Sequence, residues 1–336
     1  MTDAILSVAF AGPHVTVQDT GRPGLMRFGV PASGPMDRLA FAAANLALGN
    51  PADAPAIEVS RGGLVLACLA GEVGFAVAGG GFILEHDGVK RGSWTVARLR
   101  QGETLAIRPG PWGSWCYLAI EGRLACPTWL GHAATHSLSG LGGGRLATGQ
   151  RWTVTGTRCE ADEGAIPCPV FARPRHEIRV TLGPQDRFFA PETVERFLSA
   201  TWEMTDAWDR MGVRLKGPGI APAVALDMPS EPVLRGSVQV AGDGVASILL
   251  ADHQTTGGYP KIATVLDCDL DAMAQLRPRD PLRFTVVSPV DAIQLARTSA
   301  QRCQRYLAGL SRGCSFASGH QDKLPPRSAE SLPPAS

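Results

Sequence analysis

The sequence predicts a mostly β protein built from small barrels, and argues against a parallel sheet covered by helices on both faces. Two observations support this fold class. Short segments rich in β-branched and aromatic residues recur along the chain, often with alternating polarity. Turn residues separate them, since the 336 residues include 39 glycines and 26 prolines. The strand-like segments are residues 14–18, 73–77, 93–97, 115–120, 178–182, 236–240 and 282–287.

Only a few segments carry the start and stop signals of helices. A helix with its body over residues 39–48 is expected because Pro35 opens it at its first position, Asp37 favours its first turn and Gly49 ends it. The last predicted helix has Ser288 as its N-cap and ends at Gly309. Two further helices are predicted over residues 192–200 and 269–276.

A weak internal repeat suggests two related halves, although a generic joint between a turn and a strand would explain it equally well. The repeat covers residues 99–107, 146–154 and 276–286. Acidic residues and prolines interrupt the strands near 161–175. We therefore predict an N-terminal half over 1–165 and a C-terminal half over 170–310. The Ser/Pro-rich tail over 313–336 is expected to be disordered.

Composition and charge narrow the function classes. The chain has 44% hydrophobic and 19% charged residues, the balance of a soluble globular protein. Its net charge is +1, so no basic field would attract nucleic acid or an anionic membrane. A small molecule or another protein is the expected partner.

Location is predicted from the N-terminus, the apolar segments and the cysteines. The N-terminus lacks the pattern of a signal peptide, and Glu72 interrupts the most apolar region, 62–84, so no membrane span is expected. The eight cysteines form no Cys-x-x-Cys pair. Free thiols in a reducing cytoplasm fit this pattern best.

The most informative segment is the loop over residues 254–261. It places an amide, two hydroxyls, two glycines, a phenol and an ammonium between the apolar runs 247–251 and 262–266. Both runs are expected to be buried strands, so the loop should lie at the rim of a sheet. A polar hairpin turn is the alternative. We favour a binding loop, because such loops on rigid scaffolds commonly carry function.

Two other segments offer candidate ligand-binding groups. Ser33 and the N-terminus of the first helix, with Arg22 nearby, could bind a carboxylate or phosphate. Capping by Ser33 or Asp37 explains these residues equally well. The turn Gly140–Arg145 is either an anion-binding nest or, more simply, a tight hairpin.

Arg210 lies in a charged stretch, where it is either a clamp for a substrate carboxylate or part of a solvated edge strand. His132 and His136 have helical spacing but no third ligand, so no metal site is predicted. No Gly-x-Ser-x-Gly elbow supports a serine hydrolase. Glu58, Asp252 and His253 are the remaining acid–base candidates.

Several motifs in order resemble those of the carboxyltransferase-domain family. They are residues 17–22, 28–37, 44–58, 210–214, 230–232, 236–240 and 254–263. This family includes the C component of 5-oxoprolinase, the KipA-like proteins and proteins similar to the second subunit of allophanate hydrolase, and the resemblance covers about residues 5–295. It implies two cyclophilin-like β-barrel subdomains with a few short helices, similar to the carboxyltransferase domain of urea carboxylase.

The resemblance also implies a function. The chain is expected to be one component of an ATP-dependent hydrolase that opens 5-oxoproline to glutamate, together with A-like and B-like (KipI-like) partner components of 5-oxoprolinase. The ATP site would be shared with a partner protein or carried by it. One alternative is a biotin-dependent carboxyltransferase component acting on urea or a similar amide, with biotin on another chain. A KipA-like regulatory binding protein is the other.

Within this resemblance, the loop supplies the expected site. Lys261, Tyr259 and Gln254 are the predicted catalytic residues, because an ammonium can stabilise oxyanion charge while an amide and a phenol orient the substrate. The predicted substrate-binding residues are Thr255, Thr256, Gly257, Gly258, Arg210, Asp37, Ser33 and Arg22.

Overall fold

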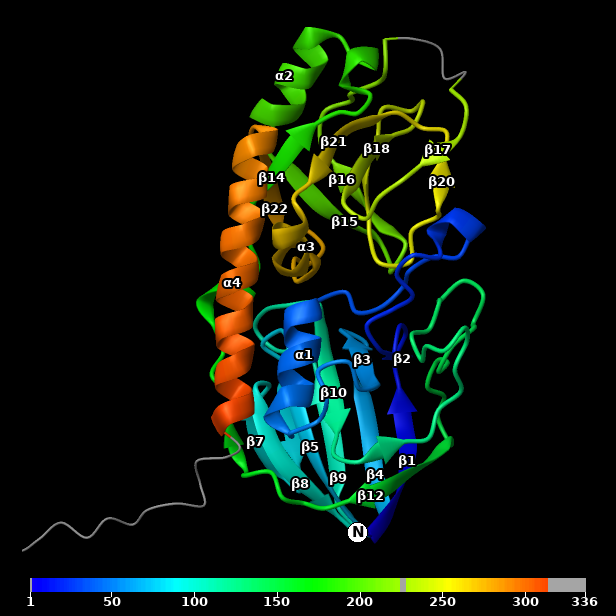
Figure 1. Cartoon of the computed structure of the whole chain (residues 1–336), viewed down its shortest axis with the longest axis vertical. Coiled ribbons are helices and arrows are strands. Elements are labelled where there is room, and N and C mark those ends of the chain that lie inside the picture. The colour runs from blue at the N-terminus through cyan, green and yellow to red at the C-terminus, as the bar shows by residue number, and fades with distance from the viewer. Residues whose placement is uncertain (1, 224–227, 314–336) are drawn as a thin grey trace, which may run out of the picture.

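The computed structural model describes residues 2–223 and 228–313. Two β-rich parts are stacked along the long axis, with the N-terminal strands at one end and the residue 177–286 barrel at the other (Figure 1). The prediction of a mostly β fold is confirmed. Among the described residues no helix is long and apolar enough to cross a membrane.

The N-terminal part consists of two antiparallel sheets. The seven-stranded sheet has the order β11 (Arg123–Leu124), β12 (Arg151–Thr157), β1 (Thr2–Ala11), β4 (Leu64–Ala70), β9 (Thr104–Arg108), β6 (Ile83–His86) and β7 (Val89–Gly92). The six-stranded sheet has the order β13 (Gly164–Ala165), β8 (Thr95–Arg100), β5 (Glu72–Ala78), β10 (Trp115–Ile120), β3 (Ala56–Ser60) and β2 (Thr16–Gln18). Leu66 from the first sheet and Leu118 from the second share one hydrophobic core.

Burial patterns explain how the sequence forms these sheets. In β12, Trp152 and Val154 are buried while their neighbours on the strand are exposed, as expected for a strand with one face on a core. In β10 every residue is buried. Its Leu118 packs into the core between the sheets, whereas Tyr117 packs under helix α1 (Arg38–Ala47).

The C-terminal part closes into a barrel in the order β14 (Glu177–Leu182), β21 (Lys261–Val265), β18 (Ser237–Val240), β19 (Ala246–Leu249), β16 (Gly212–Lys216), β15 (Trp202–Trp208) and β22 (Pro281–Val286). Only β14 and β22 pair in parallel in this barrel. A small ladder of β17 (Glu231–Pro232) and β20 (Thr256–Gly257) lies beside it. The position of the boundary between the halves stays a prediction.

The described chain contains four α-helices, at the four predicted places. They are α1, α2 (Pro191–Ser199), α3 (Asp267–Ala274) and α4 (Pro289–Gly313), with short 3-10 turns η1 (Met26–Phe28), η2 (Val170–Ala172) and η3 (Asp186–Phe188). The long helix α4 runs beside both parts and packs against α1 and α3 (Figure 1).

One predicted helix boundary is wrong, because α4 passes through Gly309 and continues to Gly313. A single glycine in a helix costs about 1 kcal/mol relative to alanine. Leu307 and Leu310 pack against the cluster beneath α1, and this packing continues the helix past the glycine. The tail predicted to be disordered lies, from residue 314 on, outside the described residues.

Candidate functional site

The polar loop over 254–261 connects β19 to β21 at the edge of the barrel, and its middle forms β20. Gly257 pairs with Glu231 of β17. The backbone N–H of Val233 donates to the carbonyl of Thr255 at 3.1 Å. The loop is therefore held in place by backbone pairing, as a rigid binding loop requires.

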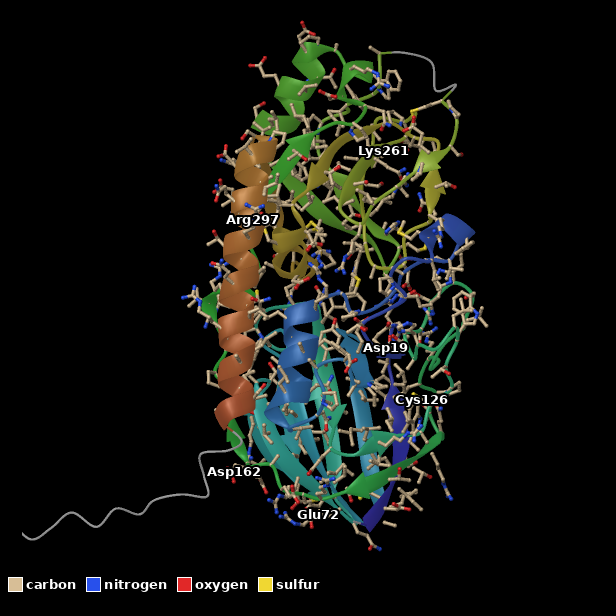
Figure 2. All side chains as sticks on the ribbon, in the orientation of Figure 1. Asp19, Glu72, Cys126, Asp162, Lys261 and Arg297 are labelled. Atoms are coloured by element: carbon tan, nitrogen blue, oxygen red, sulfur yellow. The ribbon has the colours of Figure 1, made fainter. Side chains whose placement is uncertain are left out.

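Lys261 is the buried cation of this loop. Its side chain is only 2% exposed, and Figure 2 places it in the C-terminal barrel. Its Nζ atom lies 3.6 Å from Glu231 Oε2 and makes no hydrogen bond with a described residue. Leaving a buried ammonium without hydrogen bonds is costly. This unsatisfied donor is therefore suited to contact a ligand.

Amide side chains surround the loop. Gln254 Nε2 donates to Gln239 Oε1 at 3.2 Å, while Gln239 Nε2 has no partner among the described residues. A Cβ atom at position 257 would lie 2.6 Å from that same Nε2, which explains the glycine there. Gln185 Oε1 accepts from the Lys261 N–H at 3.0 Å and fixes the backbone of the lysine.

The remaining loop side chains differ in accessibility. Tyr259 is 49% exposed and Thr256 is also exposed. Thr255 and Gly258 are partly buried. Thus the Lys261 side chain is buried, whereas Tyr259 lies at the surface of the loop. Their predicted catalytic roles stay predictions.

The guanidinium of Arg210 joins the two parts of the molecule. It is fully buried, and it donates to both oxygens of Asp252 at 2.9 Å, to Glu58, and to the carbonyl of Gly34 at 2.7 Å. Burial acts to lower the pKa of Arg210, but the charges of Asp252 and Glu58 outweigh it and raise that pKa. Groups of the protein itself therefore accept the hydrogen bonds of this guanidinium, which was predicted to bind a substrate carboxylate.

The carboxylates around Arg210 are buried as well. Burial alone would raise the pKa of Asp252, yet Arg210 and Ser137 lower it to about 2. Glu58 accepts from the Tyr117 hydroxyl at 2.7 Å and from the Met36 N–H at 2.9 Å. Asp252 directly precedes His253 and the polar loop, so this network also anchors the start of the loop.

Asp37 is the N-cap of α1. One carboxylate oxygen accepts from the Ala40 N–H at 2.9 Å, and the other accepts from Gln275 Nε2 at 2.7 Å. Burial, reinforced by the charge of Asp271, raises the pKa of Asp37 to about 7. The capping interpretation of Asp37 is confirmed, while its role toward substrate stays a prediction.

The raised pKa of Asp37 predicts a pH effect on stability. A carboxyl whose pKa is higher in the folded than in the unfolded state contributes stability below its unfolded pKa, and loses that contribution as pH rises toward 7. Compared with wild type, Asp37→Asn should therefore show a flatter dependence of unfolding free energy on pH between 4 and 7. The difference has a slope of at most about 1.4 kcal/mol per pH unit. Urea unfolding at several pH values measures it, and parallel curves would contradict the assignment.

Arg22 and Ser33 are also buried. Arg22 Nε donates to the carbonyl of Trp129 at 3.1 Å, and the guanidinium stacks 4.6 Å from the centre of the Trp129 ring. Ser33 has a left-handed backbone with φ of 55°, and its hydroxyl has no partner among the described residues. The Arg22 side chain therefore holds the 129–134 segment through its hydrogen bonds. The Ser33 hydroxyl, by contrast, has no hydrogen bond with a described residue.

His132 and His136 are the two histidines for which no metal site was predicted. His136 Nδ1 contacts Ser139 Oγ at 2.8 Å, and His132 Nδ1 lies 3.6 Å from Asp19. Within residues 2–223 and 228–313, no group of three or more His, Cys, Asp or Glu side chains is placed to hold a metal ion. The cysteines of this part of the chain are free thiols.

Comparison with known proteins agrees with this architecture. Residues 28–286 match the family model described as "Carboxyltransferase domain, subdomain A and B". The chain belongs to this family. It is 35% identical over 288 residues to the C component of 5-oxoprolinase from Haemophilus influenzae, covering 84% of this chain and 92% of that protein. It is 32% identical over 309 residues to the C component of the same enzyme from Escherichia coli, covering 90% and 98%.

A solved structure of the family extends the comparison. The Kluyveromyces lactis urea carboxylase superposes with a TM-score of 0.79 at 27% identity, over 90% of this chain and 29% of that one. This carboxyltransferase-family chain therefore corresponds to one region of a larger protein in that case.

Sequence reasoning about the functional site missed Gln239 and Gln185. A glutamine inside the fully buried strand β18 was the available signal for Gln239.

Proposed function

We propose that this chain is one component of an ATP-dependent complex that hydrolyses 5-oxoproline to glutamate. Two relatives, both named as the C component of 5-oxoprolinase, match it over nearly their whole length, which supports the reaction class. The buried, unsatisfied ammonium of Lys261 is the observation that supports the polar loop as the reacting site.

The loop has the chemistry that such a reaction needs. Opening a lactam requires water to add to the ring carbonyl, the C–N bond to break and the nitrogen to gain a proton. Negative charge develops on the carbonyl oxygen during this addition. Lys261 Nζ and Gln239 Nε2 are buried donors without a hydrogen-bond partner among the described residues, and a donor shielded from water stabilises an oxyanion more strongly than an exposed one.

The polar loop by itself fits poorly with an ATP site. A triphosphate is normally held by several cations and donors, with carboxylates that bind Mg²⁺. The polar loop instead offers one buried cation, and that cation already lies 3.6 Å from Glu231. We therefore propose that the partner proteins hold ATP.

A second candidate is a biotin-dependent carboxyltransferase component acting on urea or a similar amide. The similarity to urea carboxylase over 90% of this chain favours it. In that case another polypeptide would carry the biotin. The same oxyanion donors would then serve carboxyl transfer, so the site geometry alone is compatible with both reactions.

ADP release separates these functions. The chain should be co-expressed with A-like and B-like 5-oxoprolinase components and supplied with 5-oxoproline or urea, with and without avidin. The expected result is ADP release that requires 5-oxoproline and is unchanged by avidin. Release that needs urea and is lost with avidin would favour the carboxyltransferase. A stable complex without turnover would favour a regulatory binding protein.

A further inference from the structure

A cavity lies between the two parts of the molecule and has two adjoining sections. The larger section is about 500 Å³ and the smaller about 240 Å³, and His14, Asp209 and Met211 line both. Trp208 and Gln254 line the larger section, and residues that include Leu138 and Arg145 line the smaller one. The combined space accommodates a small organic molecule.

This cavity brings together three segments that stood out separately in the sequence. They are the turn Gly140–Arg145, the charged stretch around Arg210 and the first residue of the polar loop, Gln254. Among the residues that line the cavity, the functional site described above uses Gln254 and Ser137, which contacts Asp252. The cavity therefore gives the other two segments a shared location beside the loop.

Arg145 is an exposed cation that lines the smaller section of the cavity. Its backbone is fixed by an isolated bridge to Thr16 and by the hydrogen bond of 2.9 Å from the Leu146 N–H to the Val15 carbonyl. Its guanidinium makes no hydrogen bond or ion pair with a described residue. Arg214 also lines the cavity, but it lies 3.3 Å from Asp243.

His14 occupies a strained position on the wall between the sections. Its φ of 55° is uncommon for a residue other than glycine, and such strain tends to cluster at functional sites. Its ring lies 6.4 Å from the Trp115 ring and 6.3 Å from the Trp208 ring. Its ring nitrogens make no hydrogen bond with a described residue, so they are free to contact a ligand.

We propose that this cavity binds a small cyclic carboxylate, with Arg145 pairing its carboxylate group and His14 hydrogen-bonding its ring. The cyclic amide as substrate rests on the proposed function. Burial, with Arg145 nearby, lowers the pKa of His14 despite the opposing charge of Asp209, which favours the neutral imidazole. A neutral imidazole offers both a donor and an acceptor to a ring amide. Gln254 links the cavity to the polar loop through its bond to Gln239.

Binding of 5-oxoproline to the full chain, alone and in the complex, tests this proposal. Wild type should bind 5-oxoproline more tightly than 2-pyrrolidinone, which has the same ring without the carboxylate. Arg145→Met should weaken 5-oxoproline binding up to about fivefold, the upper end for an ion pair with an exposed arginine, and leave 2-pyrrolidinone binding unaffected. Arg151→Met removes an exposed cation on β12 and should bind as wild type does.

The outcomes separate the cavity from the reaction. Binding that depends on Arg145 in a complex without turnover would uphold the cavity and reject the proposed function. With turnover present, Arg145→Met should raise KM and change kcat little. The proposal is overturned if wild type binds 5-oxoproline in neither form, or if Arg145→Met binds it as tightly as wild type.

Discussion

Lys261→Met is expected to lower turnover of the reconstituted complex at least about a hundredfold while leaving the melting temperature unchanged or higher. Loss of one oxyanion donor typically costs two to three orders of magnitude in rate. Stability should not fall, because the ammonium is buried without a hydrogen bond and methionine fills a similar volume. Glu231 keeps its hydrogen bond from Gln185 and is 42% exposed, so it tolerates the loss of the lysine.

Lys216→Met is the matched control for this experiment. Lys216 forms a surface pair with Glu203 at 3.2 Å, and its side chain is 74% exposed. Its replacement should leave both turnover and melting temperature near the wild-type values. Normal turnover in Lys261→Met would remove the lysine from the reaction. A lowered melting temperature in that variant would instead make Lys261 a structural residue.

Local patterns were sufficient to predict the elements and the polar loop. Alternation and turn residues marked the strands, and Asp37 stood where a helix begins. The loop over 254–261 was recognisable because its polar side chains interrupt two apolar runs. The end of α4 was mispredicted because packing against α1, which depends on the fold, outweighed the weak stop signal of Gly309.

Long-range contacts were beyond what the sequence could predict. Arg210 contacts Glu58 and Gly34, residues 152 and 176 positions away, and no local pattern pairs them. For the same reason the chain could not reveal that Gly257 leaves room for the Gln239 amide. The position of Arg145 beside His14 likewise follows from how the strands fold, since the sequence alone placed His14 in a strand and Arg145 in a distant turn.

The network around Arg210 predicts the largest effect on stability. Arg210→Met would leave Glu58 and Asp252 buried without their cation, and breaking a buried pair in this way typically costs about 3–5 kcal/mol. Domains are commonly stable by only about 5–15 kcal/mol, so a large part of the stability would be lost. Arg214→Met is the control, because its pair with Asp243 is exposed on both sides and should change stability by less than about 1 kcal/mol.

The pH dependence of this loss distinguishes an electrostatic cause from a packing defect. The pKa of Asp252 is lowered to about 2 in the folded protein, so its contribution to stability is present above its unfolded pKa, near 3.8, and is lost as pH falls toward 2. Without Arg210 that contribution is absent at every pH. The gap in unfolding free energy between wild type and Arg210→Met should therefore narrow as pH is lowered from 5 toward 2, measured by urea unfolding. A gap that stays constant over this range would mean that the lost packing of the side chain, and not the uncompensated carboxylates, causes the destabilisation.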